Sequence, residues 1–169
     1  MDKYKKVVLM TGEYGYRNYT IKDIRGLKGK RQLSQTLPFL PEEAEAAEEA
    51  GIDLINTRFN YSNPELAIKI RKAAPNIFMS FVVPLLSVPT QDDALRHSYK
   101  AMELGADAVI FQGSLDNIEA LSKAGIPVQG HIGLVPRKST WTGGLRAVGT
   151  TIEDARKLYQ DVKDLENAG

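Results

Sequence analysis

The chain repeats one pattern along most of its 169 residues. Each repeat has a short extended apolar segment, a turn and a helical stretch, and in several repeats a glycine precedes the next extended segment. Strands that alternate with helices at this period are typical of βα units that build a parallel sheet. We count five such units, whose extended segments are 32–36, 53–59, 77–83, 107–111 and 127–131.

Local signals mark the helices between these segments. Pro41 predicts the start of a helix that runs to Ala50, and Gly51 predicts its end. Thr150 lies three residues before Glu153, which is the spacing of a capping box at the start of the last helix. The other helices are expected over 63–73, 90–104 and 115–124, and the last one runs from 150 or 151 to 168.

The N-terminal part does not follow the repeat. Residues 20–24 predict a short helix, and Lys6 to Met10 predict a strand within an arm over residues 1–19. We therefore divide the chain into an N-terminal arm with a short helix, residues 1–31, and the βα units, residues 32–169.

Two α/β architectures accommodate five βα units, an open doubly wound sheet and part of a (β/α)8 barrel. Central strands of a doubly wound sheet read as continuous apolar runs. Here polar or small side chains recur toward the ends of the segments: Ser34, Thr36, Asn56, Arg58, Ser80, Gln112, Gln129 and His131. A glycine-rich phosphate fingerprint is also missing after the first segment, where Thr36 to Phe39 stand instead. We therefore favour a TIM-type barrel, incomplete here.

A complete barrel typically needs about 250 residues. The chain ends with a helix where a sixth strand would begin, and five strands leave two open edges. We expect a fragment of a longer protein; the alternative is that another chain covers the edges.

Composition excludes several classes of protein. Lysine and arginine number 22, aspartate and glutamate 21, so the formal charge is +1 and a dedicated nucleic-acid binder is disfavoured. Without cysteine there is no disulfide scaffold, thiolate metal site or cysteine nucleophile. No apolar run approaches the roughly 20 residues of a membrane span, so we expect a cytoplasmic protein without nucleic-acid or membrane partners.

One stretch is more specific. Residues 125–136, Gly-Ile-Pro-Val-Gln-Gly-His-Ile-Gly-Leu-Val-Pro, surround His131. From about residue 20 onward, the sequence resembles ketopantoate hydroxymethyltransferase, of the phosphoenolpyruvate/pyruvate barrel superfamily. Shorter segments that also follow this family are 30–31, 74–76, 105–107, 143–144, 148–149 and 161–169. The resemblance implies transfer of a one-carbon unit from methylenetetrahydrofolate to 3-methyl-2-oxobutanoate in pantothenate biosynthesis. It also implies a magnesium ion that holds the 2-oxo acid and stabilises its enolate, and a homo-oligomer.

The family's acidic residues are not retained in this chain. Its strand-two aspartate falls at Phe59 and its strand-three aspartate at Val82. Its strand-four lysine and glutamate fall at Ile110 and Gln112. The glutamate that acts as the base in the family belongs to strand six. Magnesium prefers carboxylate oxygen ligands, so we expect no tight magnesium site from these residues. Magnesium and methylenetetrahydrofolate are thus cofactors by resemblance alone.

The candidate site residues come from the same strand ends. His131 is the candidate catalytic residue, binding a substrate oxygen or carrying a proton, and Arg58 is expected to hold a substrate carboxylate as a fixed cation. The substrate-binding candidates are Arg58, Asn60, Ser80, Gln112 and Lys138.

Each candidate has a structural alternative. His131 can be bonded to the backbone, Arg58 can pair with a surface glutamate, and Asn60 can cap a turn. Ser80 can merely fill the interior. The loop 137–149 either receives an anion or forms an oligomer contact through Trp141. His97 is expected on a solvated helix face.

Three functions remain open. The first is a hydroxymethyltransferase-like enzyme that forms a carbon–carbon bond through an enolate of a small 2-oxo acid. The second is a lyase or mutase of the same superfamily. The third is a catalytically silent paralogue that binds a metabolite or acts in an assembly.

Overall fold

A single parallel sheet organises the computed structural model, which describes residues 4–169. Its strands are β3 (Gln35–Thr36), β4 (Leu54–Arg58), β5 (Phe78–Val82), β6 (Ala108–Phe111) and β7 (Val128–Gly130), in the order β3-β4-β5-β6-β7. Each strand lies beside the next strand in the chain, so the winding never reverses. That order belongs to a (β/α)8 barrel, because a doubly wound sheet reverses at a switch point. The fold is a partial barrel of five βα units, as the sequence predicts.

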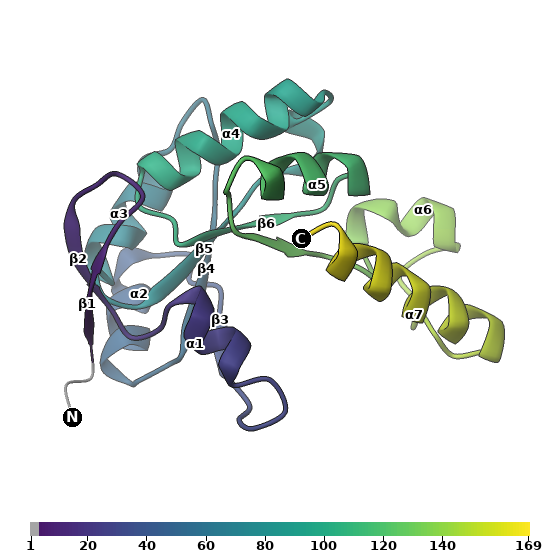
Figure 1. The fold of residues 1–169 in the computed structure, drawn as a ribbon, viewed down its shortest axis with the longest axis horizontal. Helices are drawn as coiled ribbons and strands as arrows, with labels where there is room; N and C mark the ends of the chain where they lie inside the picture. Colours follow the sequence, from purple (N-terminus) through teal and green to yellow (C-terminus); the bar gives the residue numbers. More distant parts are fainter. Residues whose placement is uncertain (1–3) are drawn as a thin grey trace.

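The helices begin where the sequence predicts, within one or two residues. They are α2 (Pro41–Glu49), α3 (Glu65–Ala73), α4 (Gln91–Glu103), α5 (Leu115–Lys123) and α7 (Ile152–Asn167). Figure 1 shows α4 and α5 over one side of the sheet, with α7 extending away from the body. Two short 3-10 helices (Leu85–Ser87 and Pro136–Lys138) and α6 (Ser139–Thr142) lie in the loops. None of the helices within residues 4–169 has the length and apolar character that a membrane crossing requires.

The capping box expected at Thr150 and Glu153 is wrong. Thr151 is the N-cap of α7, and its hydroxyl accepts the N–H of Asp154 at 3.1 Å. The cap lies one residue later because a second threonine with an acidic residue three positions on offers the same chemistry.

The N-terminal arm forms a hairpin. β1 (Lys5–Val8) pairs antiparallel with β2 (Tyr14–Arg17), and α1 (Ile21–Gly26) follows. Only the first strand was expected, because Tyr14 to Arg17 contain no apolar run. Thr20 and Asp23 form a reciprocal capping box at the start of α1.

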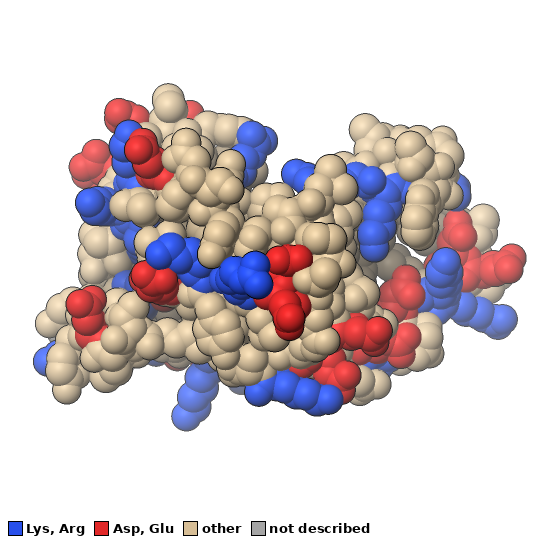
Figure 2. Space-filling model, turned by 90° about the horizontal axis from the view of Figure 1, so that it is seen from above, with Lys and Arg blue, Asp and Glu red and all other residues tan. Residues whose placement is uncertain are grey.

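The core lies between the sheet and its helices. Ile55, Phe81, Val109 and Phe111 are fully buried there. Side chains alternate along a strand. The strand residues next to these four in sequence therefore face the opposite side of the sheet, which is the barrel interior. Figure 2 shows acidic and basic side chains interspersed over one face of the molecule, without a large field of one sign.

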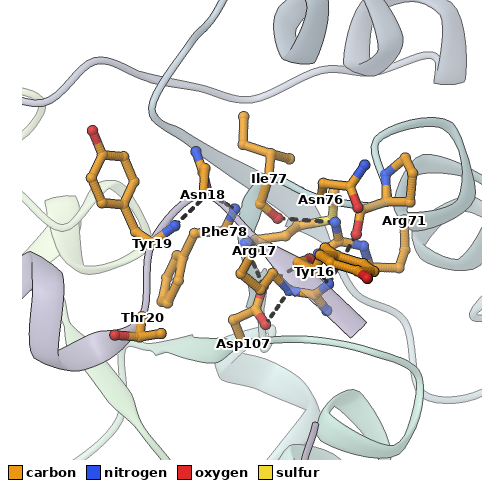
Figure 3. A network of polar contacts seen from close by, with 12 residues as sticks. Tyr16, Arg17, Asn18, Tyr19, Thr20, Arg71, Asn76, Ile77, Phe78 and Asp107 are labelled. Atoms are coloured by element: carbon orange, nitrogen blue, oxygen red, sulfur yellow. Dashed lines mark hydrogen bonds and ion pairs between the residues drawn. The ribbon is translucent and has the colours of Figure 1, made fainter. Parts of the chain in front are cut away.

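A buried ionic network closes the N-terminal end of the sheet (Figure 3). One Asp107 oxygen accepts from Arg17 Nε at 2.6 Å, and the other accepts from Arg71 Nη1 at 3.2 Å and from the Met79 amide at 2.9 Å. Arg17 also donates to the Pro75 carbonyl, and Arg71 donates to the Ala74 and Ile77 carbonyls. One carboxylate thus joins the hairpin, the end of α3 and the starts of β5 and β6.

In this network two cations, the guanidinium groups of Arg17 and Arg71, pair with the single Asp107 carboxylate. Burial lowers the pKa of Arg71 to about 10, against the opposing effect of nearby Asp107. The Arg71 guanidinium therefore remains charged at neutral pH and depends on the Asp107 charge.

Replacing this carboxylate should destabilise the fold strongly. We expect Asp107→Asn to lower the free energy of unfolding by about 3–5 kcal/mol, because two buried guanidinium groups lose their counter-charge. Urea denaturation monitored by circular dichroism measures the change. The exposed Asp92→Asn on α4 is the matched control and should change the stability little. Equal stabilities of the two variants would contradict the prediction.

A second prediction concerns acid stability. Hydrogen bonds from Lys5 and Thr20 lower the pKa of Asp23 to about 2, from an ordinary value of 3.8. The folded state therefore keeps this carboxylate charged where the unfolded state takes up a proton. Its contribution to stability is complete well above pH 3.8 and is lost as the pH falls toward 2. The stability difference between the wild type and Asp23→Asn should shrink over that range in urea titrations; a difference independent of pH would refute this.

Candidate functional site

The sheet register brings several predicted residues onto the interior face. Asn56 lies opposite Ser80 and Arg58 opposite Val82, while Val82 in turn lies opposite Ile110. Arg58 is the last residue of β4. The interior face at the carboxyl ends of β4, β5 and β6 therefore presents one cation beside two apolar side chains.

Arg58 is exposed and stacks on an aromatic ring. Its guanidinium carbon lies 4.7 Å from the centroid of the Phe39 ring. Within residues 4–169 no ion pair involves Arg58, so the expected alternative of a surface glutamate partner is not what the structure shows. The Phe39 ring thus covers one side of this cation, and no carboxylate within residues 4–169 pairs with it.

Gln112 and His131 are in direct contact. Gln112 Nε2 lies 2.9 Å from His131 Nδ1, and His131 Nε2 lies 3.1 Å from the Leu134 carbonyl oxygen. A neutral ring with its proton on Nε2 satisfies both contacts, because Nε2 then donates to Leu134 and Nδ1 accepts from Gln112. The two predicted residues are brought together, and the backbone bond of the structural alternative is present.

The other candidates have more local surroundings. The Asn60 side-chain oxygen accepts the amide hydrogens of Ser62 and Asn63, so it shapes the turn after β4. Ser80 is buried in the interior face. Lys138 ends a 3-10 helix after β7, and within residues 4–169 it forms no hydrogen bond or ion pair with the other candidates.

The residues at the family's metal positions do not fit magnesium. Phe59 is 1% exposed, and its ring centroid lies 5.8 Å from that of Phe81. Val82 is apolar, and Gln112 is hydrogen-bonded to His131. Across residues 4–169 no group of three or more histidine, aspartate or glutamate side chains is arranged to hold a metal ion. A divalent cation would meet no carboxylate at these positions.

Two features of the site region were not predicted. His97, expected in solvent, is buried to 8% exposure and stacks on Tyr61 with centroids 4.3 Å apart. Its spacing from Ala94 and Ala101, which are also buried, was the available signal. Phe39 was not identified as a partner of Arg58, because a contact between a turn and the end of a strand leaves no pattern in the sequence.

Comparison with known proteins adds the family. The model of the family described as ketopantoate hydroxymethyltransferase matches residues 64–169. The chain belongs to the ketopantoate hydroxymethyltransferase family. A 3-methyl-2-oxobutanoate hydroxymethyltransferase of Kosmotoga olearia is 35% identical, over 88% of this chain and 63% of the relative. One of Caldivirga maquilingensis is 32% identical, over 90% of this chain and 65% of the relative. The chain thus spans about 63–65% of the length of these two ketopantoate hydroxymethyltransferase family members.

Two solved structures have a distant similarity in fold to this family member. A 3,6-anhydro-D-galactonate cycloisomerase from Zobellia galactanivorans gives a TM-score of 0.45 at 16% identity, over 58% of this chain and 30% of its own. A structure described as a putative deoxyribose-phosphate aldolase from Toxoplasma gondii gives 0.44 at 14% identity, over 68% and 58%. The barrel assignment rests instead on the strand order.

The hydrogen bonds of His131 predict its tautomer. We expect neutral His131 to carry its proton on Nε2, because the Leu134 carbonyl can only accept. Nitrogen-15 chemical shifts of the ring report this directly, and in Gln112→Ala the Nδ1 shift should move while Nε2 stays protonated. A ring protonated on Nδ1 in the wild type would refute the assignment.

Proposed function

We propose that this chain binds the carboxylate of a small 2-oxo acid at the interior ends of its strands, as part of a 3-methyl-2-oxobutanoate hydroxymethyltransferase-like enzyme. The observation that carries the proposal is Arg58, an exposed guanidinium without an ion-pair partner in residues 4–169. Family membership supports the class of substrate.

Arg58 has the chemistry that a carboxylate requires. A guanidinium presents parallel N–H groups that match the two oxygens of a carboxylate, and such bidentate bonds are among the strongest in proteins. The neighbouring Val82 and Ile110 are apolar and adjacent in register. A short branched acid such as 3-methyl-2-oxobutanoate has a carboxylate that can bind Arg58 and an apolar end that can contact Val82 and Ile110.

Enolate chemistry needs positive charge near the oxygen that becomes negative. Here Arg58 supplies a fixed charge where relatives are expected to use a metal ion. His131 already has partners at both ring nitrogens, so its contribution is to orient Gln112. Neither side chain is a carboxylate base, and we assign no residue of this chain to proton abstraction.

The decisive experiment is a calorimetric titration with 3-methyl-2-oxobutanoate in the presence of EDTA. We expect binding to the wild type and an affinity roughly tenfold or more lower for Arg58→Gln, because a charge-assisted bond is worth about 1.5–3 kcal/mol. Arg156→Gln, which removes an exposed arginine on α7, is the matched control and should bind like the wild type. Absence of binding to the folded wild type would reject the proposal, as would equal loss in both variants.

Magnesium provides a second arm of the same experiment. Titration of the chain with magnesium chloride should give no tight binding, because the aligned positions lack carboxylates. A strong magnesium site would contradict the substitution of a metal by Arg58.

A specific observation also favours the catalytically silent paralogue. The positions at which the resemblance expects three acidic residues hold Phe59, Val82 and Gln112, and Ile110 stands at the expected lysine. Both ring nitrogens of His131 already have hydrogen-bond partners. Turnover of 3-methyl-2-oxobutanoate with methylenetetrahydrofolate separates the two, since a paralogue would bind the acid without product. A lyase or mutase of the same superfamily would instead transform other 2-oxo acids. Self-association stays a prediction.

A further inference from the structure

We propose that Phe39 is a positioning residue, whose ring holds the Arg58 guanidinium in the orientation that receives the substrate carboxylate. This inference rests on the proposed function and deepens it. Phe39 belongs to the turn between β3 and α2, whereas Arg58 ends β4, so the pair connects two successive βα units.

The backbone that carries the ring is held firmly. The Phe39 amide donates to Glu43 Oε2 at 2.7 Å, and the Leu40 amide donates to the same oxygen at 3.2 Å. Pro38 and Pro41 flank these residues, and each proline fixes its own backbone φ angle. Two hydrogen bonds and two prolines thus restrict the backbone that carries the ring.

The Phe39 side chain itself contributes little to the core. It is 53% exposed, and the ring face that Arg58 covers is its main described contact. A large aromatic side chain left half in solvent is not explained by hydrophobic burial. Its position over the guanidinium gives it a role in orienting that cation.

Stacking restricts the guanidinium in a useful way. The guanidinium carbon lies over the ring face, and the Arg58 N–H groups donate no hydrogen bond within residues 4–169. A carboxylate binds at the edge of a guanidinium, in the plane of the group. The contact with the ring therefore restricts the rotamers of a long side chain while its N–H groups have no other partner in the described residues.

A neighbouring contact keeps the two elements together. Gln35 on β3 donates from its side chain to the Asn56 side-chain oxygen on β4, at 2.7 Å. Asn56 and Arg58 are two residues apart and therefore lie on the same face of β4. The bond stabilises the short β3 segment beside β4, which places the Phe39 turn over Arg58.

The test uses two substitutions of the same ring. Phe39→Leu removes the ring face, and we expect an affinity for 3-methyl-2-oxobutanoate about two- to fivefold lower, the range that an exposed cation–π contact represents. Phe39→Tyr keeps the aromatic ring face and should retain the wild-type affinity. Tyr159→Leu removes an exposed aromatic ring that lies 5.9 Å from Lys163 Nζ on α7, and it should leave the affinity unchanged.

Two further readouts separate positioning from a general structural effect. In an Arg58→Gln background, Phe39→Leu should cause no additional loss of affinity, because the ring then has no cation to orient. The Arg58 side-chain protons should show a ring-current shift in the wild type and in Phe39→Tyr, and the shift should disappear in Phe39→Leu. The wild type, Phe39→Tyr and Phe39→Leu should have similar midpoints of thermal unfolding.

The outcomes distinguish the two proposals. If the wild type binds the acid and Phe39→Leu binds equally well, the positioning role is refuted while the carboxylate site stands. If Phe39→Leu loses affinity equally with and without Arg58, the ring acts through something other than this cation and the role is also refuted. If the folded wild type binds no 2-oxo acid, the proposed function fails, and the positioning role fails with it.

Discussion

The Asp107 carboxylate is the constraint on which the rest of the structure depends. It pairs with two buried guanidinium groups, those of Arg17 and Arg71, and it also accepts the Met79 amide. These partners come from the hairpin, from α3 and from β5, while Asp107 itself directly precedes β6. Removing one partner from such a group leaves a buried charge without compensation, which is far more costly than losing an exposed ion pair. The fold is thus closed at the end of the sheet where the strands begin.

The two ends of the sheet differ in how their charged side chains are paired. At the start of the strands, Asp53 provides a second fastening by accepting from Ser34, Tyr19 and Arg31. Burial tends to raise the pKa of Asp53, but these hydrogen bonds outweigh it and the pKa is lowered. At the carboxyl ends, by contrast, Arg58 has no ion-pair partner within residues 4–169. The paired carboxylates that stabilise the fold and the unpaired cation of Arg58 therefore lie at opposite ends.

The positions at which the resemblance expects three acidic residues and one lysine hold uncharged residues in this chain. Phe59 has become part of the core against Phe81, and Val82 and Ile110 are adjacent apolar residues on the interior face. Several carboxylates in one place repel one another unless a cation neutralises them. Uncharged side chains at these positions avoid that repulsion.

The sequence by itself determined the order of strands and helices, the family and the residue types at the strand ends. Helix starts such as Pro41 and Thr90 were predictable because caps and prolines act within a few residues of themselves. The unexpected β2 and the shifted cap at Thr151 show the limit of local signals.

Tertiary structure alone decided which side chains meet. The stack of Arg58 on Phe39 joins residues that are 19 positions apart, and the Gln112–His131 contact joins residues with the same separation. The burial of His97 against Tyr61 and the meeting of Arg17 with Asp107 also cross between elements. Such contacts depend on how strands register and helices pack, and a local sequence pattern carries no record of the distance between two turns.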